Sequence, residues 1–450
     1  MEVTVIGCGY VGLVTATCLA SIGHTVRGVE KDQRKLRALQ DGQCPIFEPG
    51  LQELMREHHA SGQLQFTDNV AEALGDAEVV FLAVGTPPRP DGTVDMSYLE
   101  SAGKEVCDAL AAADGREIVT IVVKSTVPAG TNRRLHAMLR AQANAQVLVV
   151  SNPEFLREGS AVKDFLEPDR IVIGGESPEA FRIMRRLYDP IVKREENFLT
   201  MNWESAELTK YAANCMLAAR ISFMNEMTIL CEHYGADIED IRKGIGSDYR
   251  IGPAFLRAGC GYGGSCFPKD VAAMEHISRA AGHESLFVHA IQTVNRTQKR
   301  RFVQRLVDKL DRPIQGAIIA VWGLAFKADT DDIRESPALD VIADLLERGA
   351  RVRATDPKAL EHMKAVYGNR VEWFIDPVSC AAGADAVALL TDWPQYSTLP
   401  FRKIAATMNQ PLIFDGRNCL HRDVMRESGF QYYPIGRPAV ERAVRAKQRA

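Results

Sequence analysis

The start of the chain restricts its fold more than any other stretch. A β-branched run, Val3 to Ile6, ends at Gly7, and Gly9 and Gly12 follow it. Apolar residues then recur at helical spacing from Val11 to Ile22. A strand that leads through Gly-x-Gly-x-x-Gly into a helix is typical of a dinucleotide-binding βαβ unit, where glycines let the backbone approach a pyrophosphate. We therefore predict a parallel sheet with a nucleotide site at its first loop.

An acidic residue after the next strand selects the cofactor. The stretch Thr25 to Val29 is typical of this strand, and Glu30 follows it, 23 residues beyond Gly7. A carboxylate at this distance accepts hydrogen bonds from the adenosine ribose hydroxyls and repels the additional phosphate of NADP. We therefore predict that the chain binds NAD.

Further strands are predicted where short apolar runs alternate with helical or loop segments. These runs are Val79 to Val84, Ile118 to Val123, Val147 to Val150 and Ile171 to Ile173. The alternation predicts a doubly wound α/β domain. Ligands of such sheets lie at the carboxyl ends of strands, so we expect the polar stretches that begin at Gly85 and Lys124 to contact cofactor or substrate.

A long helix and a second nucleotide-type fold are predicted in the second half of the chain. From Trp203 to Tyr234 apolar residues recur at helical spacing without proline or glycine, and a further helical pattern extends from Val271 to about Leu310. The stretch Ile318 to Gly323 is again a strand that ends at a glycine, and residues 383–394 repeat the pattern of residues 75–87. The second fold lacks the full glycine motif, so we expect a ligand other than a dinucleotide.

The predicted fold class is therefore α/β, with two Rossmann-like doubly wound domains joined by a long central helix. We expect an NAD-binding domain at 1–200, a central helical domain with the cysteine loop at 201–310, a C-terminal Rossmann-like domain at 311–436 and a basic flexible tail at 437–450. A chain of 450 residues is too long for one ordinary core, which agrees with this division.

Composition excludes several classes of protein. The net charge is −4, from 54 basic and 58 acidic residues, so no global field attracts nucleic acid or a membrane surface. The N-terminus lacks the basic and apolar segments of a signal peptide, and no apolar stretch has the length of a membrane span. The 10 cysteines are scattered without C-x-x-C pairs or metal-ligand spacing. We expect reduced thiols in a cytoplasmic protein that needs no metal.

One cysteine differs from the others in its surroundings. Cys266 lies in the glycine-rich stretch Gly261 to Asp270, which also supplies Lys269. A thiolate nucleophile in the same chain as a hydride acceptor suggests oxidation through a covalent acyl-enzyme. The alternative is that Cys266 is a small buried apolar side chain, which is the commoner role of cysteine and the one we expect for the others.

Six motifs extend over nearly the whole chain. They are Gly7-x-Gly-x-x-Gly12, Lys124-Ser-Thr-Val-Pro128, Asn152-Pro-Glu-Phe-Leu-Arg-Glu158, Lys210-Tyr-Ala-Ala-Asn214, Gly261-Tyr-Gly-Gly-Ser-Cys-Phe-Pro-Lys-Asp270 and Gly323-Leu-Ala-Phe-Lys-Ala-Asp-Thr-Asp-Asp-Ile-Arg-Glu-Ser-Pro337. Together they resemble the UDP-glucose 6-dehydrogenase family, over about residues 1 to 435. The resemblance implies a four-electron oxidation of a sugar primary alcohol to a carboxylate with two NAD in succession, and a C-terminal domain that binds the UDP-sugar.

The resemblance implies roles for four residues in the first oxidation. Lys210, directly or through a water, is expected to take the hydroxyl proton and to stabilise oxyanions, while hydride leaves C6 of the hexose. Thr126 and Asn214 are expected to hydrogen-bond the water or the oxyanion, and Glu154 to handle protons near the sugar. The alternatives are a solvated helix lysine for Lys210 and a loop salt-bridge partner for Glu154.

The second oxidation and the hydrolysis are implied to use the cysteine loop. Cys266 is expected to attack the aldehyde as a thiolate and to form a thiohemiacetal, which a second hydride transfer converts to a thioester. Asp270 fits the base that activates water to hydrolyse this thioester. A helix N-cap before Val271 is the structural alternative for Asp270 and is compatible with catalysis.

The motifs also imply the binding residues. Those similar to the family's cofactor segments are Gly7, Gly9, Tyr10, Val11, Gly12, Glu30, Lys35, Thr86, Thr126, Glu158, Lys269 and Arg334. Those similar to its substrate segments are Glu154, Phe155, Leu156, Arg157, Lys210, Asn214, Arg250, Phe255, Leu256, Arg257, Gly263, Lys327 and Arg417. The cationic side chains suit diphosphate oxygens, with surface solvation as the alternative for each. In the family the residue that matches Arg250 reaches across a subunit interface, which implies a homodimer or a higher homo-oligomer.

Several functions remain as alternatives. The sequence of the cysteine loop resembles that of the family members that convert UDP-glucose to UDP-glucuronate more than that of the GDP-mannose or UDP-N-acetylhexosamine members. A two-electron hydroxyacid dehydrogenase would use a histidine base and need no cysteine. A nucleotide-binding protein without activity is disfavoured because Cys266, Lys210 and Asp270 are all present.

Overall fold

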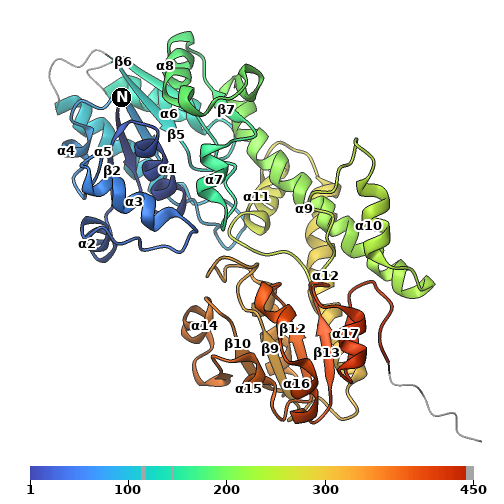
Figure 1. Cartoon of the computed structure of the whole chain (residues 1–450). Coiled ribbons are helices and arrows are strands. Elements are labelled where there is room, and N and C mark those ends of the chain that lie inside the picture. The colour runs from blue at the N-terminus through green and yellow to red at the C-terminus, as the bar shows by residue number, and fades with distance from the viewer. Residues whose placement is uncertain (113–117, 143–145, 442–450) are drawn as a thin grey trace, which may run out of the picture. The chain divides into compact units, whose positions relative to one another are not determined.

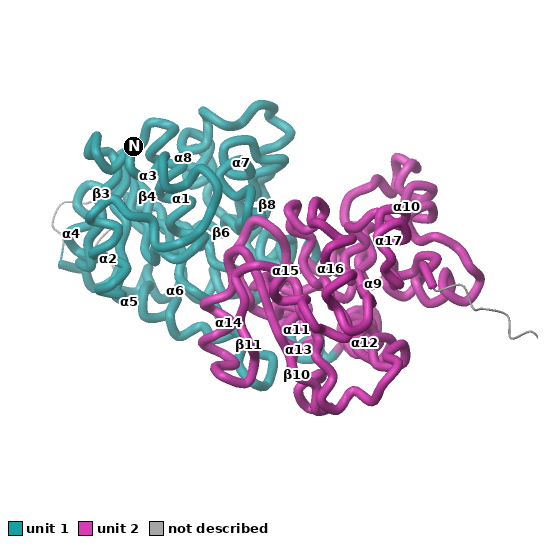
Figure 2. Tube along the Cα trace, turned by 60° about the horizontal axis from the view of Figure 1, so that its bottom comes forward, with its two compact units in different colours: residues 1–213, 276–282 teal, residues 214–275, 283–450 magenta. Residues whose placement is uncertain are grey.

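The computed structural model describes residues 1–112, 118–142 and 146–441, which form two units. Unit 1 contains Met1–Ala213 and His276–Gly282, and unit 2 contains Asn214–Glu275 and the chain from His283 onward. Figure 2 colours unit 1 teal and unit 2 magenta. Each unit has its own sheet.

The sheet of unit 1 has the strand order β3-β2-β1-β4-β5-β6-β7-β8. Its strands are β1 (Glu2–Ile6), β2 (Thr25–Val29), β3 (Leu64–Thr67), β4 (Val79–Leu82), β5 (Ile118–Val123), β6 (Gln146–Ser151), β7 (Ile171–Gly174) and β8 (Phe198–Met201). The order reverses between β1 and β4, where open α/β sheets bind their ligands. The strands predicted before the glycine motif and before Glu30 are confirmed as β1 and β2.

One pair of strands departs from the parallel arrangement expected of a doubly wound sheet. β6 and β7 pair antiparallel through Ser151 and Gly174, whereas β7 and β8 are parallel to each other. The chain that leaves the carboxyl end of β6 enters β7 from that same end of the strands and does not cross to their other end, so β7 runs in the opposite direction. The segment that returns, residues 152–170, contains the predicted substrate motif.

Helices cover both faces of this sheet because side chains alternate along each strand. Val79 and Phe81 of β4 belong to one core, while Val80 and Leu82 belong to the other. The first core packs against α1 (Tyr10–Ser21), α2 (Gln33–Gln40), α3 (Leu51–Ala60), α7 (Ala161–Leu166) and α8 (Pro178–Tyr188). The second packs against α4 (Val70–Leu74), α5 (Ser97–Ala112) and α6 (Thr131–Gln142). The doubly wound prediction is therefore confirmed.

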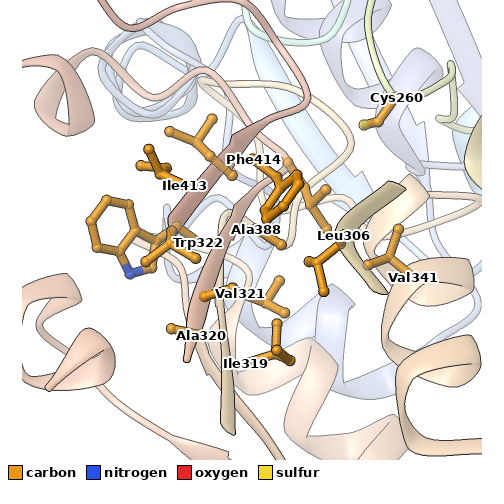
Figure 3. Packing of buried hydrophobic residues seen from close by; sticks show 14 of the residues in the cluster. Cys260, Leu306, Ile319, Ala320, Val321, Trp322, Val341, Ala388, Ile413 and Phe414 are labelled. Carbon is orange, nitrogen blue, oxygen red and sulfur yellow. The ribbon is translucent and has the colours of Figure 1, made fainter. Parts of the chain in front are cut away.

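The sheet of unit 2 repeats this order in parallel strands, β11-β10-β9-β12-β13-β14. The strands are β9 (Ile318–Trp322), β10 (Arg351–Thr355), β11 (Val371–Trp373), β12 (Ala386–Leu389), β13 (Leu412–Asp415) and β14 (Gln431–Pro434). Their helices are α13 (Pro337–Glu347), α14 (Leu360–Tyr367), α15 (Pro377–Ala381), α16 (Phe401–Thr407) and α17 (Arg422–Glu427). Figure 3 shows part of the core, in which Val321, Ala388 and Phe414 come from adjacent strands. The predicted second nucleotide-type fold is confirmed.

Four helices lie between the two sheets in the sequence. They are α9 (Trp203–Tyr234), α10 (Ile238–Gly246), α11 (Phe267–Ala280) and α12 (Leu286–Lys309). The helix predicted from Trp203 to Tyr234 is confirmed as α9. The pattern from Val271 to Leu310 is not one helix but two, because Gly282, with a φ of +76°, ends the first of them.

The described end of the chain is held in place, contrary to a flexible tail that begins at residue 437. Arg437 pairs with Asp237 at 3.0 Å, and Val440 exchanges two backbone hydrogen bonds with Tyr432. Residues 442–450 of the predicted tail lie outside the described residues. In the part of the chain that the structure describes, no helix has the length and apolar character needed to cross a bilayer.

Candidate active site

The three glycines between β1 and α1 have different structural roles. Gly7 has a φ of +92°, which side chains rarely adopt. A Cβ on Gly12 would lie 1.8 Å from the carbonyl oxygen of Gly7, so only glycine lets α1 pack this close to the turn. A Cβ on Gly9, at the N-cap of α1, would have no atom within 4 Å. The open space beside Gly9 and the N–H groups of the first helical turn fit a pyrophosphate.

The surroundings of this turn also fit NAD. Glu30 directly follows β2, and its Oε1 accepts a hydrogen bond of 2.9 Å from the Asp32 amide. The Tyr10 hydroxyl donates to Glu48, which also accepts from the Gly159 amide at 2.7 Å. Burial, the bond to Glu48 and the charge of Glu158 raise the pKa of Tyr10. The turn, Glu30 and the segment near Glu158 therefore form one corner of unit 1.

The loops after β4 and β5 lie together at the same edge of the sheet. The Ser125 hydroxyl donates to the Val84 carbonyl at 2.6 Å. Thr86 is buried and Thr126 is half-buried, one in each loop, while Lys35 is exposed at the start of α2. Thr86 thus follows β4, which pairs with β1, and Thr126 follows β5, the next strand of the sheet.

Lys210 and Glu154 form a buried ion pair in unit 1. Lys210 Nζ lies 3.0 Å from Glu154 Oε1, and the two side chains are 4% and 8% exposed. Glu154 Oε2 accepts from the Leu156 amide at 2.5 Å. Burial acts to raise the pKa of Glu154, but the Lys210 ammonium, the Leu156 amide and the Lys124 ammonium outweigh it and lower the pKa. Lys210 is therefore not a solvated helix lysine, and Glu154 does serve as a salt-bridge partner.

The substrate segment after Glu154 packs around this pair. The Phe155 ring lies 5.3 Å from Lys210 Nζ and 3.9 Å from the Arg170 guanidinium. Arg157 forms a salt bridge of 2.5 Å with Asp164. The motif thus places an aromatic ring, a carboxylate and several cations at the edge where β6 ends.

Unit 2 holds the thiol and the predicted hydrolytic base together. Cys266 is half-buried and directly precedes α11, and its carbonyl accepts the Asp270 amide at 2.8 Å. Asp270 is fully buried, and its two oxygens accept from Asn214 Nδ2 and from Lys269 Nζ, each at 2.6 Å. Because α11 begins at Phe267, Asp270 lies inside the first turn and is not the N-cap.

A second cysteine nearby, Cys215, is a buried thiol with a raised pKa. Cys215, next to Asn214 on α9, is buried. Burial and the charge of Asp270 raise its pKa to about 12. Cys266, by contrast, is partly exposed and lies at a helix N-terminus, where the helix dipole favours a thiolate.

Buried polar residues of α12 hold the loop that leads to Cys266. The Asn295 side chain accepts from the Tyr262 amide at 2.8 Å and donates to the Tyr262 carbonyl at 3.1 Å. Gln298 donates to the Gly259 carbonyl at 2.8 Å. A Cβ on Gly263 would lie 2.1 Å from the Glu335 carbonyl oxygen, so this glycine is needed for close packing. Sequence reasoning missed Asn295 and Gln298, although amides on the apolar face of a predicted helix are a signal of such bonds.

Arg417 ties the same loop to the sheet of unit 2. Its guanidinium donates to the carbonyls of Leu390 at 2.7 Å, Phe326 at 2.8 Å and Gly261 at 3.3 Å. It therefore has a structural role in addition to the substrate contact predicted for it. Lys327 lies next to this cluster, with its ammonium 5.4 Å from the Phe326 ring.

The other predicted binding residues of unit 2 differ in their burial. Arg250 pairs with Asp248, and Arg334 with Asp332, each at 2.6 Å. Arg257 is exposed and Leu256 is buried. Phe255 has a φ of +58°, which costs free energy in a residue other than glycine and often marks a functional loop.

The candidate residues thus form one cluster in each unit. Unit 1 brings together the nucleotide turn, Glu154 and Lys210, and unit 2 brings together Cys266, Asn214 and Asp270. The long helix α9 (Figure 1) contains both Lys210 and, four residues later, Asn214. Residues at this spacing lie on the same face of a helix.

Comparison with known proteins assigns three domains along the chain. Models of the UDP-glucose/GDP-mannose dehydrogenase family match residues 1–192 as the NAD binding domain, 204–297 as the central domain and 320–422 as the UDP binding domain. A UDP-glucose 6-dehydrogenase of Pseudomonas aeruginosa is 45% identical to the chain, over 97% of this chain and 98% of the relative. A UDP-glucose 6-dehydrogenase of Rhizobium meliloti is 43% identical, over 97% of this chain and 100% of the relative. A solved UDP-glucose dehydrogenase from Pyrobaculum islandicum is similar with a TM-score of 0.90 and 39% identity, over 97% of this chain and 98% of that one.

Fold, cofactor site and comparisons define an NAD-dependent oxidoreductase built from two Rossmann-like folds. The chain belongs to the UDP-glucose/GDP-mannose dehydrogenase family. The family resemblance of the six motifs and the prediction of NAD are thereby confirmed.

Proposed function

We propose that this protein oxidises UDP-glucose to UDP-glucuronate and reduces two NAD for each sugar, through a thioester on Cys266. The observation that carries this proposal is the arrangement of unit 2, where a half-buried thiol at a helix N-terminus lies one turn from a buried carboxylate. Both the Pseudomonas and the Rhizobium relatives are UDP-glucose 6-dehydrogenases, which supports UDP-glucose as the substrate.

In the first step Lys210 takes the proton of the sugar C6 hydroxyl. Bound NAD supplies the hydride acceptor for both oxidations. Glu154, 3.0 Å from the amine of Lys210, accepts its hydrogen bond and fixes its direction. Thr126 and Asn214 would bind the water or the oxyanion, and Glu158 would contact the nicotinamide. Burial of the pair excludes bulk water, which strengthens each of these interactions.

In the second step the Cys266 thiolate attacks the aldehyde. The new C–S bond turns the aldehyde oxygen into the alkoxide of a thiohemiacetal, and loss of hydride from that carbon re-forms the C=O bond and gives the thioester. Covalent attachment keeps the sugar bound between the two oxidations. An enzyme without such a nucleophile would release the aldehyde.

Hydrolysis of the thioester then uses Asp270. Its carboxylate accepts a proton from the attacking water, and the Cys266 thiolate leaves. Asn214 and Lys269 hold the two carboxylate oxygens, which fixes their direction. Because Asp270 lies in the first turn of α11, it follows the thiol by one helical turn.

The nucleotide part of the substrate binds to the C-terminal fold and to the loops near it. The family model describes residues 320–422 as a UDP binding domain. Lys327, Arg257 and Arg250 supply cations for the diphosphate, and Phe255, Leu256 and Gly263 shape the loops around it. The sugar lies against the segment from Glu154 to Arg157.

We also infer that the protein forms a homodimer through α9. Exposed apolar side chains recur on this helix at Met216, Phe223, Leu230 and Tyr234, which share one face. Monomeric proteins rarely expose a continuous apolar stripe of this length. None of the ten cysteines, which all lie in the described part of the chain, forms a disulfide, and this suits a reducing compartment such as the cytoplasm.

Counting NADH tests the proposed reaction. Purified protein is incubated with excess NAD and limiting UDP-glucose, and in parallel with GDP-mannose and with a UDP-N-acetylhexosamine. We expect two NADH per UDP-glucose and UDP-glucuronate as the product. Turnover of only one of the other sugar nucleotides would replace the substrate, and a ratio of one NADH per sugar would contradict the thioester route.

A further inference from the structure

A buried lysine that takes no part in the proposed steps lies beside the Glu154 segment. Lys124 follows β5 and is 6% exposed. Its ammonium donates to Asn152 Oδ1 at 3.0 Å and to the Tyr188 hydroxyl oxygen at 3.5 Å. Within the described ranges no carboxylate lies within salt-bridge distance of it. A charged group this deep in a protein ordinarily has an ionic partner or a catalytic use.

The contacts of Lys124 fix the start of the substrate segment. Asn152 Oδ1 also accepts from the Tyr188 hydroxyl at 2.6 Å, and Asn152 Nδ2 donates to the Val172 carbonyl at 2.9 Å. The Asn152 amide donates to the Val123 carbonyl at 2.9 Å. Asn152 is therefore held on every side, and Glu154 follows it by two residues.

The ammonium groups of both Lys210 and Lys124 act on the Glu154 carboxylate. Glu154 makes its salt bridge with Lys210, and the charge of Lys124 further lowers the Glu154 pKa after the effects of burial, Lys210 and the Leu156 amide. Burial lowers the pKa of Lys124 itself to about 8, with Glu154 opposing and Lys210 adding to that shift. Because repulsion between charges is mutual, Lys124 also favours the neutral amine of Lys210.

The remaining groups around Lys124 do not replace this effect. Tyr188, whose pKa burial raises, stays neutral, and the rings of Tyr188 and Phe165 lie 5.9 Å from the ammonium. A cavity of about 360 Å³ adjoins Lys124. The other charged residues in its lining are Arg157, Lys163, Asp164, Glu167, Asp169 and Arg170. They carry both signs, and Arg157 with Asp164 already forms a pair.

We propose that Lys124 is a positioning residue for the first oxidation: it holds Glu154 as a carboxylate and makes Lys210 give up its proton more readily. This inference rests on the proposed function, in which Lys210 takes the hydroxyl proton. A lysine that must be neutral to act as a base needs a pKa lowered toward neutral pH, and a neighbouring positive charge acts in that direction together with burial. Lys124 supplies that charge from its buried position beside Asn152.

The pH dependence of kcat/KM tests this role. In K124Q, which keeps a donor for Asn152 but no charge, Lys210 retains its proton to higher pH. We expect the acidic limb to move up by about one pH unit, and the rate at neutral pH to fall about tenfold. K124R, charged at every assay pH, should return the limb toward the wild-type position. K163M, which alters an exposed lysine on the same cavity, should match the wild type, as should the KM for NAD in all variants.

Two outcomes of this assay would overturn the proposal. One is an unmoved acidic limb in K124Q, and the other is an equal loss of rate at all pH values, which would indicate a merely structural role. The profiles are recorded with whichever sugar nucleotide the wild type oxidises. Failure on UDP-glucose alone would therefore count against the proposed substrate and not against Lys124.

A second measurement does not depend on turnover. The free energy of unfolding in urea is measured for the wild type, K124Q, E154Q and the double variant at pH 7. Because Lys124 and Glu154 attract each other, we expect removal of the lysine charge to be more destabilising when Glu154 is intact than when it is Gln. Additive effects in this cycle would contradict the interaction on which the proposal depends.

Discussion

At the scale of single residues, the candidate cluster of each unit contains charged groups that are buried away from water. Glu154 and Lys210 are buried in unit 1, and Asp270 is buried in unit 2 beside Asn214 and Lys269. Burying a charge is costly unless it is paired and hydrogen-bonded, and each of these carboxylates has such partners. The positions of these side chains are therefore set before any ligand binds.

The nucleotide turn offers a matched pair of substitutions. In Gly12→Ala the new Cβ would meet the Gly7 carbonyl at 1.8 Å, so we expect a loss of at least about 2 kcal/mol of stability. In Gly9→Ala the Cβ meets nothing within 4 Å, so stability should change by less than about 1 kcal/mol. The KM for NAD should nevertheless rise about tenfold or more, because the methyl group occupies the pyrophosphate position. Normal NAD binding in Gly9→Ala would contradict this cofactor position.

The buried lysine predicts a pH-dependent stability. The pKa of Lys124 is lowered from 10.5 to about 8, so between these values the unfolded chain binds more protons there than the folded protein. Below about pH 8 the buried Lys124 ammonium destabilises the folded protein by its full amount, and this destabilisation disappears as the pH rises toward 10.5. Relative to K124M, the wild type should gain up to about 3 kcal/mol across this range in urea unfolding. Parallel curves for the two proteins would contradict a lowered pKa.

At the scale of elements, loops next to the candidate sites are held by helices through side-chain to backbone bonds. Asn295 and Gln298 of α12 bind backbone groups before Cys266, and Glu207 of α9 accepts from the Gly130 and Asn132 amides at the start of α6. Each bond satisfies backbone groups that would otherwise be buried without a partner. Loop geometry near the thiol and near Thr126 thus depends on residues distant in sequence.

A substitution in α12 tests this dependence. Asn295→Leu leaves the Tyr262 amide and carbonyl without their partners, so we expect a loss of about 2–3 kcal/mol of stability and a drop in kcat of about tenfold. Thr297→Leu, on the exposed side of the same helix, should change stability by less than about 0.5 kcal/mol. Thermal unfolding and NADH assays measure both effects. Wild-type kcat in Asn295→Leu would show that the thiol loop needs no support from α12.

Elements with strong local patterns could be predicted from the sequence, and others could not. The runs at β2, β5 and α9 match the predicted bounds, because each has a clear period between turn residues. The strands β3, β8, β11, β13 and β14 were not predicted, because each is only three or four residues long and lies at or next to the edge of its sheet. The direction of β7 depends on where the connecting chain crosses the sheet, which periodicity does not encode.

The site was predictable in its residues and not in its contacts. Motifs supplied Cys266, Lys210 and Glu154, but the pairing of Lys210 with Glu154 joins residues 56 positions apart. Lys124 was predicted only as part of a ligand-facing loop, because the burial of a single lysine does not follow from its neighbours in sequence. The structure was needed to show which charged side chains lie close enough to interact.

At the scale of the whole molecule, three family domains follow one another and two of them repeat one strand order. The repeat supplies two nucleotide-type folds, of which only the first has the complete glycine turn. The helix α9 begins in unit 1 and continues in unit 2, and it carries both Lys210 and Asn214.

The apolar stripe of α9 predicts the effect of a charge on assembly. Phe223→Glu should weaken the proposed homodimer about a hundredfold or more, because a carboxylate would be buried without a partner. Ile375→Glu, which alters an isolated exposed apolar residue, should leave assembly unchanged. Sedimentation velocity over a range of concentrations measures both. Equal sedimentation of Phe223→Glu and the wild type would exclude α9 as the interface.

The most direct test asks whether the sulfur of Cys266 bonds to the substrate. In Asp270→Asn, where hydrolysis should be slow, the protein is mixed with UDP-glucose and NAD, quenched in acid and examined by mass spectrometry. We expect the peptide containing Cys266 to carry the UDP-hexuronyl group as a thioester, and Cys266→Ala combined with Asp270→Asn to carry none. Unmodified Cys266 throughout, together with full conversion to UDP-glucuronate by Cys266→Ala alone, would contradict the account.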